Sequence, residues 1–405
     1  MFSVRRGGPE WAKDGNLIAT QRPLRVAIDA TPMLVAQRTG IERYVTALVR
    51  ELAAIYPALD DTRLAVYLHA GNPYASKAHL DEAVEVLAAV GLPYRVYGQR
   101  RGYGAVLSAF AALDRLDLLH MLPRARPRIQ VCPYLLTIYD IKSVGLSKEG
   151  QQIERATLSA DETRMIREAA GLITISESTT RDLATEFGDA LRMPIRAIHL
   201  GVDAVYSTGQ DHAEAMRQKY GLGQYIFFVG TLQYRKNLPR LIEAFAEVKR
   251  DHGIPHKLVL AGRDGWGAEL VYQAVREQGV ETEVLFPGYI PESDLPGLYA
   301  GADVYAYPSL HEGFGIPLLE AMASGTVVYT SNLYSIPEVA GDAAIYVDPY
   351  DVASMAAGLM RALCEDALRA DLVARGKARA ASFSWQRMAL ETLDFYLSLR
   401  SRHNA

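Results

Sequence analysis

The sequence predicts an α/β fold with two domains that face each other across a cleft, and three observations predict it. Its 405 residues are more than one compact domain usually holds and enough for two. Short apolar runs typical of buried strands alternate with segments of helical periodicity. This alternation is interrupted near residues 203–222 and then restarts. A strand–helix rhythm favours a parallel sheet covered by helices on both faces, so we expect one such sheet in each domain.

The first domain begins with the apolar run LRVAIDA at 24–30, which we expect to be a strand. A helix should follow Gly40, because apolar residues recur there at helical spacing. Further buried strands are expected at 134–140, 171–176 and 195–201. Ser176 is a residue type that caps helices, and it stands directly before the next helical segment.

The second domain repeats the same rhythm with six expected strands, at 225–230, 257–262, 284–289, 303–309, 327–331 and 343–348. An amphipathic helix over 384–400 closes the chain. The expected units are a loosely ordered lead-in, a first domain, a linker, a second domain and a final helical segment, at 1–22, 23–203, 204–222, 223–382 and 383–405. Ligands of open α/β sheets bind beyond the carboxyl ends of the strands, so the chemistry is expected there.

Composition excludes several classes of protein. The formal net charge of -4 argues against a nucleic-acid partner. Cys132 and Cys364 lie far apart, which argues against a disulfide framework or a zinc site and fits the reducing cytoplasm. We find no apolar run of the length a membrane-spanning helix needs and no apolar stretch typical of a secretory signal near the first residues. We therefore expect a cytoplasmic protein.

Several nucleotide and hydrolase motifs are also missing from the sequence. No GxGxxG follows the first strand, which argues against a nicotinamide dehydrogenase. There is no GxxxxGK[ST] phosphate loop and no GxSxG nucleophile turn. The candidate loops hold neither HExxH nor a pair of aspartates suited to a metal. Candidate ligand-binding loops are therefore identified by their charged side chains and glycines.

Two cations stand where the first strand of the second domain gives way to a helix. In FFVGTLQYRKNLPRLIEAF (227–245), Arg235 and Lys236 lie beside the expected helix start, with Asn237 as its N-cap. Positive side chains near the positive end of a helix form an anion site, which suits a diphosphate. A solvated pair of surface cations is the plainer interpretation of the same residues.

Two carboxylates flank a glycine loop in PSLHEGFGIPLLEAMASG (308–325). Glu312 lies in the loop and Glu320 in the first turns of a helix that Pro317 helps to begin. Gly313 and Gly315 let backbone amides approach a ligand closely. Ionised carboxylates accept hydrogen bonds from hydroxyls, so sugar and ribose hydroxyls are candidate ligands. The alternatives are a loop acid with a helix-terminal charge, or the acid–base couple of a glycoside hydrolase.

The first domain offers weaker candidates. Gly40 opens a helix and could bring amides near a phosphate or an acceptor, although one glycine there is usually only a turn. Asp140 and His120 end strand-like runs and are expected to project toward the cleft. A hydrogen-bonded core histidine is at least as good an interpretation of His120.

Taken together, FVGTLQYRKNLPRLIEAF, LVLAGRDGWG, the long block from FPGYIPESDL to AAIYVDPYD, and TGIERY resemble the family-4 glycosyltransferases over about residues 24–400. The Glu-x7-Glu block is the most specific part of this likeness. The resemblance implies a GT-B fold of two Rossmann-like, doubly wound domains, with the last helix returning to the first domain. It also implies a retaining transfer from a nucleotide-diphosphate sugar, assisted by Arg235 and Lys236 without any metal or other cofactor.

The resemblance also assigns roles to individual residues. Glu312 would contact hydroxyls of the donor sugar, and Glu320 the ribose. The implied catalytic residues are Glu312, Arg235, Lys236, Asp140 and His120. The implied donor-binding residues are Gly40, Thr231, Arg263, Tyr289, Ile290, Gly313, Phe314, Gly315 and Glu320. One departure stands out, because relatives often carry a histidine where this chain has Tyr139, directly before Asp140.

The likeness to mannosyl- and rhamnosyl-type members favours a GDP- or dTDP-linked donor and a glycan or lipid-diphosphate acceptor in surface polysaccharide or glycolipid synthesis. A nucleotide-sugar epimerase or hydrolase, or a non-catalytic partner subunit, are alternatives on the same scaffold. Residues 95–128 hold seven arginines, and we hypothesise that they contact a lipid acceptor or an anionic membrane surface at its inner face. A solvated basic loop is the alternative. Weaker liposome binding after joint mutation of Arg124, Arg126 and Arg128 would support the membrane hypothesis.

Overall fold

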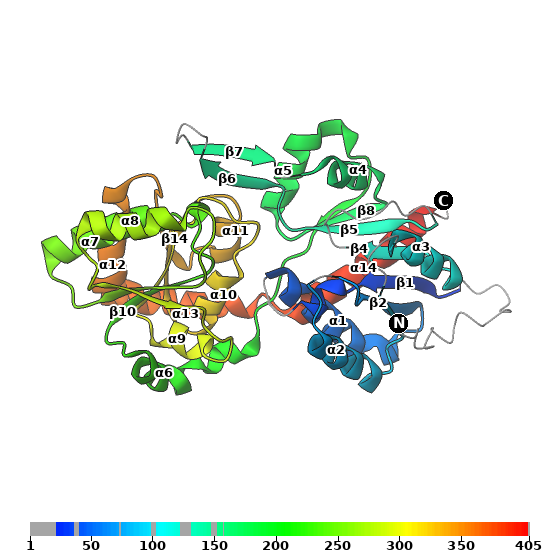
Figure 1. The fold of residues 1–405 in the computed structure, drawn as a ribbon, viewed down its shortest axis with the longest axis horizontal. Helices are drawn as coiled ribbons and strands as arrows, with labels where there is room; N and C mark the ends of the chain where they lie inside the picture. The colour runs from blue at the N-terminus through cyan, green and yellow to red at the C-terminus, as the bar shows by residue number, and fades with distance from the viewer. Residues whose placement is uncertain are drawn as a thin grey trace.

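The computed structural model describes residues 22–35, 40–72, 74–98, 103–121, 131–146, 152–156 and 158–403, and these form two α/β domains joined by two chain crossings (Figure 1). Of the expected lead-in, only Arg22 falls within this set. The carboxyl ends of the strands of one domain face those of the other, because the loops after β5 and β8 contact the loop after β13. The candidate site lies between these ends.

The N-terminal domain is built on a seven-stranded sheet in which every recorded pairing is parallel, with strand order β3-β2-β1-β4-β5-β8-β9. The strands are β1 (Leu24–Asp29), β2 (Thr62–His69), β3 (Tyr94–Tyr97), β4 (Leu118–Met121), β5 (Tyr134–Ile138), β8 (Gly171–Thr174) and β9 (Ile195–Ala197). The helical elements are η2 (Thr31–Leu34), α1 (Gly40–Ile55), η3 (Tyr56–Ala58), α2 (Lys77–Ala89), α3 (Tyr103–Leu113), α4 (Ala160–Glu168), α5 (Glu177–Phe187) and η4 (Gly188–Ala190). The four expected strands are confirmed, whereas β2 and β3 were not singled out.

The expected cap of α5 is also confirmed, because the side chain of Ser176 accepts a hydrogen bond from the backbone N–H of Thr179 at 3.0 Å. An element that the sequence did not predict is the antiparallel hairpin of β6 (Lys142–Leu146) and β7 (Gln152–Ala156). The hairpin extends from the N-terminal domain toward the other domain, where β6 contacts the turn η6 (Tyr234–Lys236) (Figure 1).

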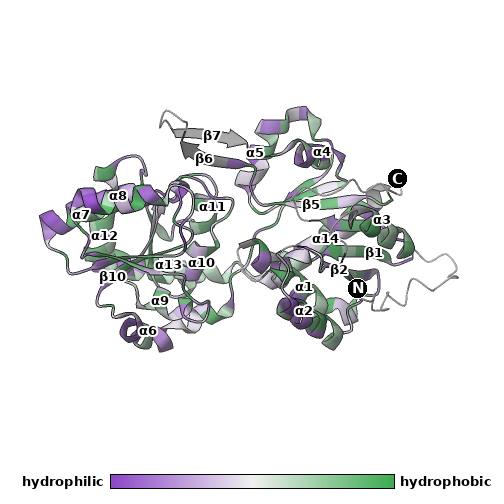
Figure 2. Ribbon diagram, in the orientation of Figure 1, coloured by the Kyte–Doolittle hydropathy of each residue, from purple (hydrophilic) through white to green (hydrophobic). Residues whose placement is uncertain are grey.

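The C-terminal domain has a six-stranded parallel sheet in the order β12-β11-β10-β13-β14-β15. Its strands are β10 (Tyr225–Val229), β11 (Lys257–Ala261), β12 (Val284–Gly288), β13 (Val304–Tyr307), β14 (Val327–Ser331) and β15 (Ala344–Val347), so all six expected strands are confirmed. The helices are α7 (Leu238–His252), α8 (Ala268–Gln278), α9 (Leu295–Gly301), α10 (Ile316–Ala323), α11 (Ile336–Ala340), α12 (Val352–Cys364) and α13 (Asp366–Ala381). Hydrophobic residues concentrate on the strands and on the helix faces toward them (Figure 2).

The segment expected to be a linker, 204–222, is helical and packs as part of the C-terminal domain. It forms η5 (Ala204–His212) and α6 (Ala213–Tyr220), and both contact α9. The contact is close, since a side chain at Gly209 would come within 2.3 Å of the carbonyl oxygen of Pro296. Glycine is therefore needed there to let two backbones meet.

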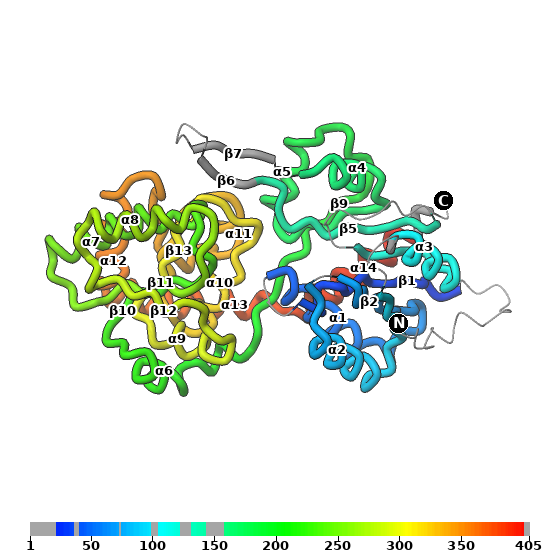
Figure 3. Tube along the Cα trace, viewed as in Figure 1, coloured from blue at the N-terminus to red at the C-terminus, as the bar shows by residue number. Residues whose placement is uncertain are grey.

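The chain crosses back to the N-terminal domain at its end, as expected. Helix α14 (Trp385–His403) continues beyond α13 and packs on α1 and β1 (Figure 3). The two crossings touch, because Trp385 Nε1 donates to Asp203 Oδ1 at 3.0 Å. A side chain at Gly201 would lie 2.3 Å from the backbone nitrogen of Trp385, so the crossings are packed backbone to backbone.

Candidate active site

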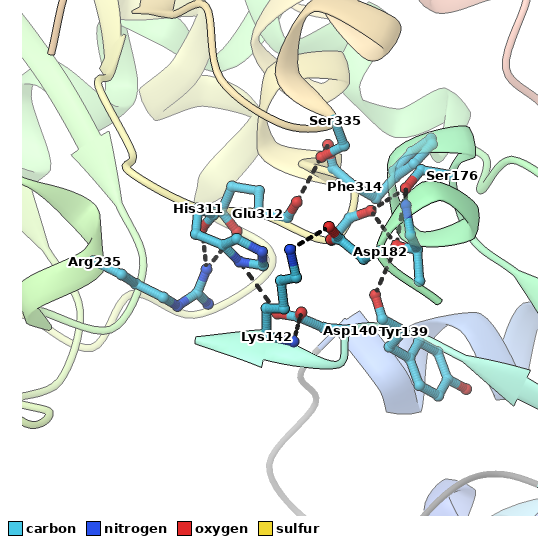
Figure 4. Close-up of polar contacts among 12 residues, drawn as sticks. Tyr139, Asp140, Lys142, Ser176, Asp182, Arg235, His311, Glu312, Phe314 and Ser335 are labelled. Atoms are coloured by element: carbon cyan, nitrogen blue, oxygen red, sulfur yellow. Dashed lines mark hydrogen bonds and ion pairs between the residues drawn. The ribbon is translucent and has the colours of Figure 1, made fainter. Parts of the chain in front are cut away.

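The glycine loop between β13 and α10 is held in one conformation by its own residues. Gly315 has a φ of +106°, in the region that favours glycine, and directly precedes α10. Pro317 lies in the first turn of that helix, as the sequence predicted. The buried hydroxyl of Ser335 donates to the carbonyl oxygen of Glu312 at 2.8 Å and of Phe314 at 3.0 Å (Figure 4). The loop therefore presents Glu312 from a fixed backbone.

Glu312 lies between the two cations that the sequence singled out. Its Oε2 accepts from Arg235 Nη1 at 2.7 Å, and its Oε1 accepts from Lys236 Nζ at 2.5 Å. Lys236 also donates to the hydroxyl of Tyr307 at 2.8 Å. Glu312 and Lys236 are buried, so neither is the solvated side chain that was the alternative interpretation. We call Arg235, Lys236 and Glu312 the charge cluster.

Burial and mutual attraction set the protonation of the charge cluster. Burial alone would raise the pKa of Glu312, but the charges of Arg235 and Lys236 outweigh it and hold that pKa well below its usual range. Burial, together with the positive charge of Arg235, lowers the pKa of Lys236 to about 8 although Glu312 opposes this. Burial would also lower the pKa of Arg235, yet the Glu312 carboxylate keeps it above its usual value. Two cations against one carboxylate leave a net positive charge for an anionic ligand.

The turn that carries the cations is anchored to its neighbour in the sheet. The backbone of Leu232 donates to the carbonyl oxygen of Arg263 at 2.8 Å and accepts from Gly265 at 2.8 Å.

The N-cap prediction for Asn237 is wrong in its mechanism, because its side chain makes no cap hydrogen bond. Asn237 instead adopts a left-handed conformation and donates through Nδ2 to the carbonyl oxygen of Pro349 at 2.7 Å.

Glu320 is buried in a network that joins the domains. Arg43 of α1 forms an ion pair with its Oε1, and the hydroxyl of Tyr299 donates to its Oε2 at 2.7 Å. Arg43 also donates to Asp203 Oδ2 at 2.8 Å. Both carboxylate oxygens of Glu320 therefore already accept from protein donors, and the side chain is buried. The role of Glu320 as a ribose ligand stays a prediction.

Gly313 lies at a close contact between the two domains. A side chain there would stand 2.2 Å from the carbonyl oxygen of Tyr139, at the end of β5. The carbonyl of Gly313 accepts from Ser176 Oγ at 2.7 Å, again across the interface (Figure 4). Gly40, the first residue of α1, lies near Ile316, so the structure brings the predicted glycines of both domains to one interface.

Asp140 faces the charge cluster from the N-terminal domain, and it has a partner that the sequence did not reveal. Asp140 Oδ2 lies 3.4 Å from Nδ1 of His311, the buried residue directly before Glu312 (Figure 4). The other Asp140 oxygen accepts from the backbone N–H of Lys142 at 2.9 Å. Burial raises the pKa of Asp140, although the charges of His311 and Arg235 partly counter it. His311 gave no sequence signal beyond its place in the Glu-x7-Glu block.

His120 lies inside the N-terminal domain. Its Nδ1 is 2.6 Å from the hydroxyl of Tyr396, and its Nε2 is 2.7 Å from Oγ1 of Thr137. Burial lowers its pKa to about 3, so the ring is neutral. These contacts favour the core histidine that the sequence left open. They give His120 no free nitrogen for a substrate.

The remaining donor-binding candidates lie on the loops after β10, β11 and β12. Thr231 is exposed, and the guanidinium of Arg263 lies over the ring of Tyr289 at 4.9 Å. Tyr289 is 58% exposed, whereas Ile290 is buried. Their roles toward a nucleobase stay predictions.

The arginine-rich segment is only partly described. Arg95 forms an ion pair with the buried Asp114, so its side chain has a structural role in the N-terminal domain. Of the other arginines that carried the membrane hypothesis, Arg115 is described and exposed, whereas Arg100, Arg101, Arg124, Arg126 and Arg128 lie outside the described residues. Within the described ranges no three His, Cys, Asp or Glu side chains gather as a metal site would require, and no helix is long and apolar enough to cross a membrane.

Comparison with known proteins finds a family whose sequence model matches part of this chain. The sequence model of the family described as "Glycosyl transferases group 1" matches residues 212–379. The O-antigen chain mannosyltransferase B of Escherichia coli is 39% identical over 181 residues, which are 44% of this chain and 48% of that protein. The serotype-specific mannosyltransferase WbdA of Escherichia coli is 30% identical over 199 residues, 48% of this chain and 24% of that protein. The match thus spans about half of the first relative and about a quarter of the second.

Solved structures agree on the architecture of both domains. Sucrose-phosphate synthase from Thermosynechococcus elongatus has a TM-score of 0.69 at 20% identity, over 94% of this chain and 100% of that one. Anabaena HepE in complex with UDP and glucose has a TM-score of 0.67 at 19% identity, over 93% and 100% of the two chains. At such identities the likeness shows the fold alone.

Proposed function

We propose that this protein is a glycosyltransferase with a nucleotide-diphosphate sugar as donor, because residues 212–379 match the model of the glycosyl transferases group 1 family and the two domains have the GT-B fold. The observation that carries the proposal is the charge cluster. It places a fixed positive charge and a buried carboxylate at the carboxyl end of β10 and β13, beside the facing domain.

The chemistry follows from those charges. Breaking the bond between sugar and diphosphate leaves negative charge on the diphosphate, and Arg235 and Lys236 would stabilise it in a buried setting. Two protein cations then do the work that a metal ion does elsewhere, so we propose that the reaction needs no metal. Glu312 orients the two cations and accepts from hydroxyls of the sugar.

We propose that the transfer retains the configuration of the sugar. In this mechanism the leaving diphosphate oxygen takes the proton of the acceptor hydroxyl on the same face of the ring. The carbon–oxygen bond to the acceptor forms there as the bond to the diphosphate breaks. No protein carboxylate acts as nucleophile, which agrees with Glu312 being held by two cations.

The relatives suggest the sugar and the process. Both Escherichia coli relatives are named mannosyltransferases, and the first is named for the O-antigen chain. We therefore propose mannose, or a rhamnose-type sugar, as the transferred unit, and a glycan or lipid-linked acceptor of a surface polysaccharide. A cytoplasmic protein that contacts the inner membrane face at the acceptor is part of the same proposal.

The test is release of nucleoside diphosphate from a panel of GDP-, dTDP- and UDP-sugars with EDTA present. We expect one donor to be turned over by the wild type and about 10²-fold or more slowly by Arg235→Ala/Lys236→Ala. Arg250→Ala, an exposed cation at the far end of α7, is the control and should match the wild type. Turnover that stops with EDTA would reject the metal-free mechanism. Equal release with and without acceptor would indicate a hydrolase.

A further inference from the structure

His311 is a buried side chain whose polar atoms have no hydrogen bond within the described residues. The residue is 1% exposed, and neither Nδ1 nor Nε2 finds a hydrogen-bond partner. A buried polar group left in this state is costly, so it needs an explanation. The backbone around it is fixed, because its carbonyl oxygen accepts from Arg235 Nη1 at 2.8 Å. One edge of the ring is packed by Tyr334, at 4.3 Å between centroids.

The group nearest to Nδ1 comes from the other domain. Asp140 Oδ2 lies at 3.4 Å, just beyond hydrogen-bond length, so a small rotation of either side chain closes the contact. The opposite oxygen of Asp140 is anchored by the backbone N–H of Lys142. The carboxylate is thus held on its own domain at one oxygen and aimed at His311 with the other (Figure 4).

We propose that His311 is a positioning residue, which donates from Nδ1–H to Asp140 and so holds that carboxylate beside the charge cluster, where it orients the acceptor hydroxyl. This inference rests on the proposed sugar transfer. It adds a residue on the donor side that prepares a group on the acceptor side. The catalytic residues of the two domains are then correctly placed for the reaction only when the domains are in contact.

The protons balance without any further partner. Asp140 accepts a hydrogen bond from the acceptor hydroxyl but does not take its proton, which goes to the leaving diphosphate. His311 keeps the proton on Nδ1, and the tautomer is fixed because Asp140 accepts it. Asp140 must therefore be ionised for the reaction.

The ionisation of Asp140 depends on the groups that face it. His311, Arg235 and the backbone N–H of Lys142 lower its pKa, while burial and Glu312 raise it. The Lys142 ammonium is itself paired with Asp182 at 2.9 Å. Removal of His311 should therefore raise the pKa of Asp140 and shift loss of activity to higher pH.

The experiment measures the pH profile of kcat/KM and the kcat of His311→Leu and His311→Asn. For His311→Leu we expect kcat to fall about 10-fold with little change in the KM for donor, because orientation and not donor binding is lost. The acid limb of the profile should move to higher pH. His311→Asn, which keeps an N–H donor, should recover part of kcat and move the acid limb back toward its wild-type position.

His256 provides a matched control in the same domain. It is also buried, it has an unpaired Nδ1, and its Nε2 lies 3.7 Å from Asp303 Oδ2. It precedes β11, at the amino end of the sheet, on the side away from the charge cluster. His256→Asn should leave kcat and the acid limb unchanged. An unchanged profile and kcat in His311→Leu would overturn the proposal.

A second measurement does not depend on activity. In ¹⁵N-histidine spectra of the chain, which has nine histidines, His311→Asn identifies the His311 signal by its loss. The Nδ1 resonance of His311 should shift in Asp140→Asn, because the carboxylate that accepts its N–H is gone. An unmoved His311 resonance would reject the pairing. If the wild type transfers no sugar at all, the proposed function fails while this spectrum still decides on the pair.

Discussion

Arg43 and Glu320 form an ion pair that joins α1 of the N-terminal domain to α10 of the C-terminal domain. Glu320 is almost fully buried, and Arg43 reaches it while also holding Asp203 at the first chain crossing. The residue that the Glu-x7-Glu spacing assigned to a ligand thus contributes, in this arrangement, to the contact between the domains.

Loss of one partner of this pair should destabilise the protein. We expect Arg43→Met to lower stability by about 3–5 kcal/mol, because Glu320 would remain as a buried carboxylate without its cation. The measurement is thermal and urea unfolding. The double variant Arg43→Met/Glu320→Gln should regain a large part of the loss, and a double variant no more stable than Arg43→Met would show that the pair is not coupled.

Gly313→Ala should force the domains apart. The new methyl group would meet the carbonyl oxygen of Tyr139 at 2.2 Å, which backbone atoms on both sides cannot relieve locally. We expect sugar transfer to fall by about 100-fold or more, with secondary structure unchanged by circular dichroism and a larger radius of gyration in solution scattering.

Gly223→Ala is the control for this prediction, since a side chain there meets nothing within 4 Å and its φ is not positive. It should match the wild type in both measurements. A fully active Gly313→Ala protein would show that the close approach of Gly313 to Tyr139 is not needed for the reaction.

Donor capture should weaken at alkaline pH. Burial and Arg235 lower the pKa of Lys236 to about 8, so the free enzyme loses one of its two cations as the pH rises through that value. We expect kcat/KM for donor to fall on the alkaline side with a midpoint near pH 8, whereas kcat falls later because bound diphosphate favours the charged form. Lys236→Arg should abolish the alkaline fall of kcat/KM, since guanidinium stays charged. If the fall persists in that variant, another group causes it.

The Glu338 carboxylate should make interdomain stability depend on pH. It accepts from the backbone N–H of Glu177 at 2.7 Å and of Ser178 at 3.0 Å, and from Nε2 of His199 at 2.6 Å. Burial would raise the pKa of Glu338, but these partners outweigh it and lower it. A carboxyl with a lowered folded pKa contributes stability above its unfolded pKa and loses it as the pH falls through the folded value.

Glu338→Gln should therefore lower the unfolding temperature at pH 7, by an amount that corresponds to about 1–2 kcal/mol. The gap to the wild type should close as the pH is lowered through the pKa of Glu338. Thermal unfolding across a pH series checks this. A gap that stays constant down to acid pH would mean that the charge of Glu338 is not what matters.

The sequence predicted the fold far better than the interface. The strands β10 to β15 were found because strands buried on both faces leave continuous apolar runs. The hairpin of β6 and β7 has no such run, and the pattern of 204–222 did not reveal that it packs on α9. Arg235, Lys236 and Glu312 were predicted because charged residues at strand ends are conspicuous.

The partners of these residues could not be predicted in the same way. Arg43 and Glu320 are 277 positions apart, so nothing local links them. His311 was overlooked for a different reason, since a histidine beside a conspicuous glutamate carries no periodicity of its own. The proposed role of His311 depends on Asp140, which the fold brings close to it from the other domain.

The contact between Asp203 and Trp385 has a mechanical consequence. The two chain crossings that link the domains touch at this point. One domain can therefore rotate relative to the other only about an axis that passes near these crossings. Such a swing moves Glu320, close to the axis, very little, and it moves the Gly313–Tyr139 and His311–Asp140 contacts much more. Substrate exchange would then use a hinge motion about an axis near Asp203. This motion would separate the reacting groups most, because they lie far from the axis.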